Sequence, residues 1–278
     1  MTRMIDTGTD DLLAHVDGHV GVITFNRPER RNALSLGIYD GFAAALPELA
    51  GDADVRVLML TGAGGAFCAG GDVKGMHESH QSGTPRAGRP TLFEAAVAKI
   101  RQDQRTVSLA LHQFPKPVVA ALPGAAAGAG LSIALAADIR IAAERALLVT
   151  AFAGVGASGD FGGSWFLTQL VGTAKAKELY FTSPRLTAAD ALDLGLVNQV
   201  LPDAGFEDAA LEWCRDLAKR APIATRLMKE NLNRAITCDL PTALDAEGVA
   251  MVSSMRTADH REAAAAFVEK RDPVFRGA

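Results

Sequence analysis

The sequence predicts a mixed α/β fold that ends in a purely helical segment. Short apolar runs of strand length alternate with stretches of helical periodicity through the first 200 residues. From Phe206 onward only helical patterns remain. The chain has 278 residues, of which 49% are hydrophobic, so it can bury a large core. We therefore expect an α/β core over residues 1–204 and a helical subdomain over residues 205–278.

The first part of the chain predicts a hairpin, a helix and a buried strand. Asp17-Gly18 favours a tight hairpin because both turn positions tolerate positive φ. Ser35 is suited to cap the N-terminus of a helix that runs to about Leu49. The expected strands are Leu12 to Val16, Val20 to Phe25 and Val55 to Leu60.

The middle of the chain continues the alternation of strands and helices. The polar, Gly/Pro-rich segment from His77 to Pro90 has no periodicity and predicts a mobile surface loop. The expected strands are Val118 to Leu122, Ile139 to Ala142, Leu147 to Val149 and Val197 to Leu201. The expected helices are Phe93 to Phe114, Ala129 to Ala137, Gly162 to Leu170, Ala174 to Tyr180 and Ala188 to Leu194, followed by helices that start near Phe206, Pro222, Pro241 and Asp259.

Bulk composition narrows the classes of partner. The net charge of -4 gives no general attraction to nucleic acid or to an anionic membrane. The three cysteines are odd in number and lack the pair spacing of metal ligands, which favours a reducing compartment. No signal peptide and no unbroken run of about 18 apolar residues opens the chain. We expect a cytoplasmic protein without a metal site, a nucleic-acid partner or a membrane partner.

Two glycine-rich loops are the most informative feature of the chain. They are Ala66-Phe67-Cys68-Ala69-Gly70-Gly71-Asp72 and Gly124-Ala125-Ala126-Ala127-Gly128-Ala129-Gly130. Small side chains let a ligand atom reach the backbone N–H groups. Two such donors that converge on one carbonyl oxygen form an oxyanion hole. The alternative is that both loops are only tight connections.

Four motifs in order resemble the enoyl-CoA hydratase/isomerase, or crotonase, superfamily. They are Asn26-Arg27-Pro28-Glu29-Arg30-Arg31-Asn32-Ala33-Leu34, Thr61-Gly62 with Phe67-Cys68-Ala69-Gly70-Gly71-Asp72, Pro115-Lys116-Pro117-Val118-Val119-Ala120-Ala121, and Ala136-Ala137-Asp138-Ile139-Arg140. The resemblance runs from about Leu13 to Arg271. It implies a crotonase-like spiral of ββα units with a C-terminal helical subdomain that packs against neighbouring subunits as a homotrimer or a hexamer.

The resemblance also implies a coenzyme A thioester substrate and places the groups that bind it. The two oxyanion donors map onto the main-chain amides of Ala69 and Ala129. Arg27, Arg30 and Lys74 are candidate partners for the coenzyme A phosphates, with solvated surface charge as the alternative for each. No tightly bound cofactor is expected, because coenzyme A enters as part of the substrate.

The acid/base positions depart from those of the hydratases that the chain resembles. Ser132 and Phe152 stand where those enzymes place two glutamates, and neither side chain can move a proton from water near neutral pH. Asp160, eight residues after Phe152, stands where several isomerases of the superfamily carry an aspartate. Burial beside Phe161 and Trp165 would raise the pKa of its carboxyl group and suit it to proton exchange. The alternative is that Asp160 only caps the following helix.

These residues predict an enzyme that shifts a double bond in an enoyl-CoA thioester. Asp160 would move the proton between two carbons while the oxyanion hole stabilises an enolate. Two alternatives stay open. One is hydration, or nucleophilic attack by Asp160, on the same scaffold. The other is a non-catalytic acyl-CoA-binding or assembly protein.

Overall fold

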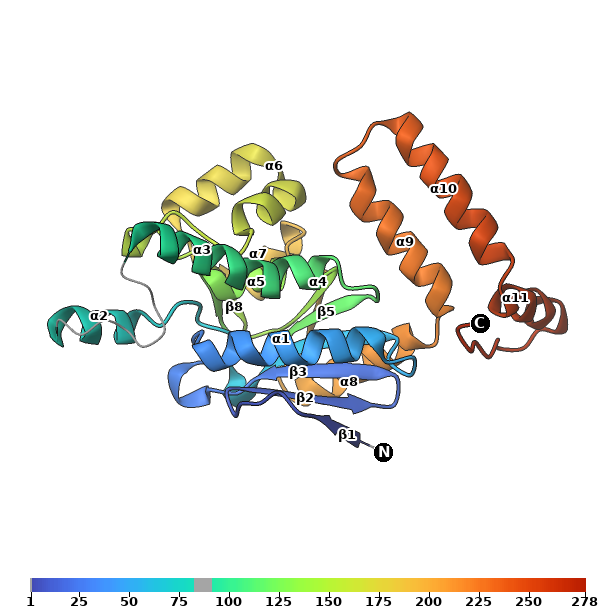
Figure 1. Ribbon diagram of the computed structural model, residues 1–278, viewed down its shortest axis with the longest axis horizontal. Coiled ribbons are helices and arrows are strands. Elements are labelled where there is room, and N and C mark those ends of the chain that lie inside the picture. The colour runs from blue at the N-terminus through green and yellow to red at the C-terminus, as the bar shows by residue number, and fades with distance from the viewer. Residues whose placement is uncertain (1, 83–91) are drawn as a thin grey trace.

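The computed structural model describes residues 2–82 and 92–278 (Figure 1). A seven-stranded sheet has the order β1-β2-β3-β4-β5-β7-β10, and a small sheet has the order β6-β8-β9. The strands are β1 (Thr2–Ile5), β2 (Leu12–Asp17), β3 (Val20–Phe25), β4 (Val57–Gly62), β5 (Val118–Leu122), β6 (Ala126–Ala127), β7 (Ile139–Ala143), β8 (Leu147–Val149), β9 (Leu186–Thr187) and β10 (Gln199–Leu201).

The helices follow the expected order, apart from α2, which was not expected. They are α1 (Leu36–Gly51), α2 (Val73–Ser82), α3 (Phe93–Gln104), α4 (Ala110–His112), α5 (Ala129–Leu135), α6 (Gly163–Thr182), α7 (Ala188–Asp193), α8 (Phe206–Ala218), α9 (Pro222–Ala235), α10 (Leu240–Met255) and α11 (Ala258–Glu269). A π-helical turn, Arg105–Leu109, joins α3 to α4, so the helix expected from Phe93 to Phe114 is nearly continuous. Short 3₁₀ turns cover Pro28–Arg30, Ala63–Gly65 and Ala153–Val155.

The central strands are buried on both faces, as strands of a largely parallel sheet must be. Successive side chains point to opposite faces, so neighbours along one strand enter different cores. Leu60 of β4 packs in the larger core with α1 and α5, whereas Met59 packs in a second core against α8. The mixed α/β fold expected from the sequence is therefore confirmed.

Local signals explain several helix boundaries. The hydroxyl oxygen of Ser35 accepts a hydrogen bond from the N–H of Ile38, which makes Ser35 the N-cap of α1 as expected. Gly172 has non-helical backbone angles (φ 75°, ψ 165°) inside α6. It separates the two helical stretches that the sequence predicts there.

Two N-terminal features differ from the expectations. β1, which was not expected, pairs antiparallel with β2 at the edge of the sheet. The prediction of a loop beginning at His77 is wrong for its first residues, because α2 extends to Ser82. A carboxylate oxygen of Asp72 accepts a hydrogen bond from the N–H of Gly75, 2.9 Å away, and so caps the start of α2. The rest of the expected loop, residues 83–90, lies outside the described residues.

The C-terminal part of the chain is helical, as expected. α8 packs its apolar face on the sheet, while α9 and α10 form an antiparallel pair that stands beside the α/β core (Figure 1). The subdomain boundary near residue 204 stays a prediction. Among the described helices, none is both long and apolar enough to cross a membrane.

Candidate functional site

The two glycine loops lie against each other, backbone to backbone. The N–H groups of Phe67 and Cys68 donate to the carbonyl of Ala125 at 3.0 and 3.2 Å, and Ala127 donates back to Cys68 at 2.9 Å. A Cβ atom on Gly130 would lie 2.2 Å from the Cys68 carbonyl oxygen. The contact therefore needs glycine at position 130, and the loops are more than separate tight connections.

Ala129 presents a free backbone N–H where the loops meet. It is the first residue of α5 and follows Gly128, which has a positive φ of 53°. Within the part of the chain that the structure describes, its N–H has no hydrogen-bond partner, as expected at a helix N-terminus. A Cβ on Gly70 would lie 3.0 Å from the Ala129 nitrogen, so the first loop passes directly beside this donor.

The N–H of Ala69, the other expected donor, is already engaged. It donates to the carbonyl oxygen of Arg31 at 3.0 Å. Arg31 and Asn32 both have positive φ, and the Asn32 side chain fixes this turn by donating to the carbonyls of Ala63 and Ala66. As it stands, this hydrogen bond uses the N–H that an oxyanion would need.

Gly71, two residues later, was not singled out from the sequence. Its N–H has no hydrogen-bond partner among the described residues. It follows Gly70, which passes beside Ala129. The absence of a side chain at both Gly70 and Gly71 was the available signal, but the sequence alone does not reveal which amides of the loop are paired.

Asp160 lies in a turn of unusual backbone conformation. Gly159, Phe161 and Gly162 all have positive φ (101°, 51° and 76°). The N–H of Phe161 donates to the Gln104 side chain of α3 at 3.0 Å, which anchors the turn. The N-cap of α6 is Gly162, without a side-chain capping bond. Gly162, and not Asp160, therefore stands at the N-cap position of this helix.

Ser132, Phe152 and Tyr180 gather around the Asp160 turn. A Cβ on Gly163 would lie 2.2 Å from the Ser132 hydroxyl oxygen and 2.6 Å from that of Tyr180. The rings of Phe152 and Tyr180 stack with centroids 5.8 Å apart. Phe152 also flanks Gly128, since a Cβ there would lie 3.8 Å from its ring. The structure thus brings Ser132 and Phe152 together with the Asp160 turn and the start of α5.

Tyr180 was not identified from the sequence. Burial, followed by the negative charge of Asp160, raises the pKa of its phenol to about 12, while a hydrogen bond with Ser132 opposes the rise. The buried Tyr180 hydroxyl has no well-formed hydrogen bond to a described residue, Ser132 included. The phenol is therefore neutral at physiological pH.

An apolar hollow of about 300 Å³ adjoins the Asp160 turn. It lies between the α3–α4 segment and the start of α6. His112 and Trp165 contact each other edge to face across its wall, with ring centroids 5.4 Å apart. Burial lowers the pKa of His112, and nearby Lys229 lowers it further against the opposing charge of Asp138. The residues that line this hollow are Gln104, Arg105, Ser108, Leu109, His112, Phe161, Gly162, Trp165 and Phe166.

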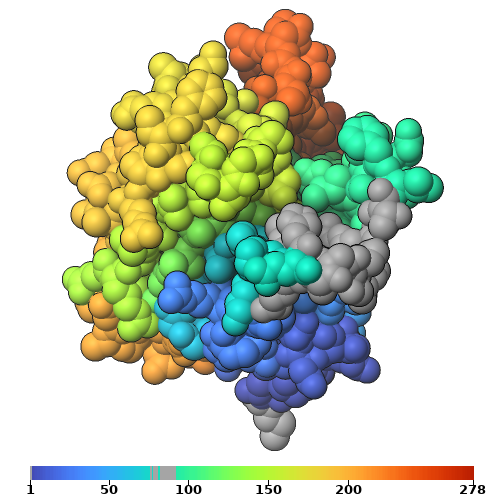
Figure 2. Space-filling model, turned by 90° about the vertical axis from the view of Figure 1, so that its left-hand side faces the viewer, coloured from blue at the N-terminus to red at the C-terminus, as the bar shows by residue number. Residues whose placement is uncertain are grey.

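The three candidate phosphate ligands, Arg27, Arg30 and Lys74, differ in their contacts and exposure. Arg27 donates to the Ala33 carbonyl at 2.6 Å and lies 3.6 Å from an Asp11 carboxylate oxygen, so it supports the loop itself. One buried guanidinium nitrogen of Arg30 has no hydrogen-bond partner among the described residues. Lys74 is exposed on α2. Figure 2 shows the face on which α2 lies in cyan.

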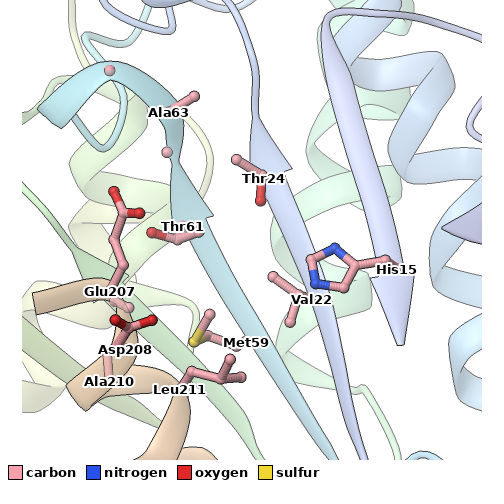
Figure 3. A pocket seen from close by; sticks show the side chains of 13 residues that line it. His15, Val22, Thr24, Met59, Thr61, Ala63, Glu207, Asp208, Ala210 and Leu211 are labelled. Atoms are coloured by element: carbon pink, nitrogen blue, oxygen red, sulfur yellow. The ribbon is translucent and has the colours of Figure 1, made fainter. Parts of the chain in front are cut away.

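A second hollow, of about 370 Å³, lies on the α8 side of the sheet (Figure 3). His15, Thr24 and Thr61 project from the strands toward Glu207 and Asp208 of α8. Burial lowers the pKa of His15, against the charge of Asp17. None of the expected site residues lines this hollow, so it is separate from the candidate site.

Comparisons with known proteins agree with this geometry. The family model of enoyl-CoA hydratase/isomerase matches residues 15–278. The chain is 36% identical to the 1,2-epoxyphenylacetyl-CoA isomerase of Escherichia coli over 96% of this chain and 98% of that protein. It is 35% identical to the short-chain-enoyl-CoA hydratase of Clostridium acetobutylicum over 94% of this chain and 96% of that protein.

Solved structures show the same fold. The crystal structure of an enoyl-CoA hydratase from Bacillus anthracis superposes with a TM-score of 0.86 at 35% identity, covering 96% of this chain and all of that chain. Family match, relatives and fold agree over nearly the whole chain. The chain therefore belongs to the enoyl-CoA hydratase/isomerase family, whose crotonase fold it shares, and it is an enzyme that acts on coenzyme A thioesters.

Proposed function

We propose that this enzyme shifts a double bond within an enoyl-CoA thioester, with Asp160 as its single acid/base group. One observation carries the proposal. Ser132 and Phe152 fill the positions of the two hydratase glutamates, and Asp160 lies on the turn beside them. A serine and a phenylalanine cannot activate water, whereas one carboxylate can both remove and return a proton.

The reaction proceeds in two proton transfers. Asp160 removes a proton from the carbon next to the thioester carbonyl, and the C–H electrons move to the thioester oxygen, which leaves the existing double bond conjugated with the enolate. The resulting enolate is stabilised by backbone N–H donors as its charge develops. Protonated Asp160 then returns the proton to the other end of the conjugated system. No atom is gained or lost, and the double bond has moved.

Ala129 and Gly71 are the oxyanion donors in this proposal. Both N–H groups are unpaired within the described residues, and the loops that carry them lie in contact. Ala69, the donor expected from the sequence, contributes only if its hydrogen bond to Arg31 opens when substrate binds. Ala129 is common to both assignments.

The acyl group and coenzyme A are assigned to separate regions. The hollow beside Phe161 and Trp165 has the apolar lining that an acyl chain or ring needs, and it adjoins the Asp160 turn. Of the expected cations, Arg30 fits a coenzyme A phosphate best, because one of its buried nitrogens lacks a partner among the described residues. Lys74 is a second phosphate ligand, while Arg27 supports the turn.

The wild-type enzyme tests the proposal with two substrate series. Matched 3-enoyl-CoA and 2-enoyl-CoA thioesters of several chain lengths and ring types are incubated in deuterium oxide. The products are separated by chromatography, and their gain of deuterium or water is measured by mass spectrometry. We expect conversion of 3-enoyl to 2-enoyl thioesters, with deuterium uptake to the extent that the proton held by Asp160 exchanges with solvent before it is returned. The proposal fails if 2-enoyl thioesters gain water at the higher rate, if an acyl adduct on Asp160 is trapped, or if thioesters bind without turnover. These outcomes correspond to hydration, nucleophilic catalysis and a binding protein.

We also propose assembly into a homotrimer or a dimer of trimers through the C-terminal helices. Large apolar side chains are exposed on α9, α10 and α11, with Leu232 at 70%, Val249 at 71% and Phe267 at 86%. Such exposure over neighbouring helices is typical of a face that another chain covers. Light scattering at micromolar concentration is expected to give the mass of three or six chains. A stable monomer would contradict the assignment.

A further inference from the structure

Tyr180 occupies a position whose hydroxyl is not needed for packing. Its ring stacks on Phe152 at 5.8 Å with an interplanar angle of 19°, a contact that phenylalanine would also make. Its hydroxyl oxygen is buried without a well-formed hydrogen bond to a described residue. A buried polar atom without a hydrogen bond costs free energy. Packing therefore does not explain why position 180 carries a tyrosine and not a phenylalanine.

The hydroxyl is held against the turn that carries Asp160. A Cβ on Gly159 would lie 3.3 Å from the Tyr180 oxygen, and a Cβ on Gly163 would lie 2.6 Å from it. Residues 159 and 163 bracket Asp160, and only glycine at both leaves room for the phenol. The Ser132 hydroxyl reaches the same point from α5, 2.2 Å from the position of a Gly163 Cβ.

We propose that Tyr180 is a positioning residue for Asp160: its hydroxyl, backed by Ser132, donates toward the carboxylate and fixes the direction in which Asp160 faces the substrate. The inference rests on the proposed role of Asp160. Burial and the negative charge of Asp160 raise the pKa of the phenol, which stays protonated and can act as a donor throughout the physiological pH range. A carboxylate that must reach two carbons in turn benefits from a fixed orientation.

The test is a double-mutant cycle between Tyr180→Phe and Asp160→Asn. Tyr180→Phe keeps the stacked ring and deletes only the hydroxyl. We expect kcat for 3-enoyl-CoA isomerisation to fall about tenfold with KM within about twofold, a loss in the range seen when groups that orient a reacting residue are removed. In the Asp160→Asn background, Tyr180→Phe should not lower the residual rate further. This residual rate is measured as slow deuterium uptake.

Thr182→Val is the matched control. Thr182 lies on the same helix, is exposed, and its hydroxyl donates to the Glu178 carbonyl at 2.8 Å, so kcat should stay unchanged. Circular dichroism and binding of a non-reactive coenzyme A thioester establish that each variant is folded.

Three results would overturn the inference. They are an unchanged kcat in Tyr180→Phe, an equal fold-loss in both backgrounds, or a loss that appears only in KM. If Asp160→Asn alone keeps full activity, the proposed function fails as well. The Asp160→Asn single variant therefore tests the proposed function separately from the role of Tyr180. If only the coupling is missing, Asp160 keeps its role and Tyr180 loses its own.

Discussion

Gly130→Ala is predicted to separate the two glycine loops and to reduce catalysis more than folding. The added Cβ would meet the Cys68 carbonyl oxygen at 2.2 Å and the Cys68 carbonyl carbon and Cβ at 2.8 Å each. Since a tolerated C···O contact is about 3.3 Å, the loops must part by roughly 1 Å. That carbonyl also accepts the 2.9 Å hydrogen bond from Ala127, so the register of both loops changes.

The size of the effect follows from this displacement. Misplacing reacting groups by about 1 Å costs on the order of 100-fold in rate, so kcat/KM for isomerisation should fall about that far. Forcing one extra carbon into a packed interior costs about 1–3 kcal/mol of unfolding free energy. Urea denaturation gives the stability, and absorbance of the conjugated thioester gives the rate.

Gly248→Ala serves as the matched control for Gly130→Ala. Gly248 lies within α10, and a Cβ there would meet nothing within 4 Å. Alanine is favoured over glycine inside a helix, so stability should rise by about 0.8–1.0 kcal/mol with unchanged activity. A Gly130→Ala enzyme with wild-type kcat/KM would refute the argument that close contact between the loops builds the site.

Three further predictions concern a backbone donor, a buried ion pair and the thiols. Ala129→Pro should fold, because proline is tolerated at the first position of a helix, yet lose about 100-fold in kcat with its N–H; wild-type turnover would exclude Ala129 as a donor. Lys229→Met should cost about 1.5–3 kcal/mol in urea denaturation, because it removes the ammonium 2.7 Å from half-buried Asp138, which still accepts a hydrogen bond from the N–H of Val118; a loss below about 1 kcal/mol would contradict this. Burial raises the thiol pKa of Cys68 and Cys214 to about 12, so a disulfide reagent at pH 8 should label at most the third cysteine until the protein unfolds, and rapid labelling of either buried thiol would contradict it.

Much of the fold could be predicted because its signals are local. The Asp17-Gly18 turn, the Ser35 cap and the apolar strand runs each depend on neighbours in the sequence, and the structure confirms them. β1 escaped prediction because three of its four residues are exposed and carry no apolar alternation. α2 escaped because its cap, Asp72, belongs to a loop that was considered only for its glycines.

The site was less predictable because it depends on pairings across the chain. Whether an amide is free depends on its acceptor: Ala69 is engaged by Arg31, 38 residues earlier, through a left-handed turn that the sequence does not announce. Tyr180 reaches the turn that carries Asp160 because α6 folds back after the break at Gly172, and helical periodicity does not show this. The residue types at positions 132, 152 and 160 could be interpreted from the sequence, but their proximity could not.

The proton-transfer role of Asp160 is tested most directly by Asp160→Asn with 3-enoyl-CoA in deuterium oxide. Asparagine keeps the size of the side chain and deletes the group that accepts the proton. Because asparagine caps a helix about as well as aspartate, unfolding free energy should change little. Isomerisation and deuterium uptake should fall together by roughly 10² to 10⁴, the range for a general acid/base group, while thioester binding persists. A folded Asp160→Asn enzyme that isomerises at the wild-type rate would contradict the role assigned to Asp160.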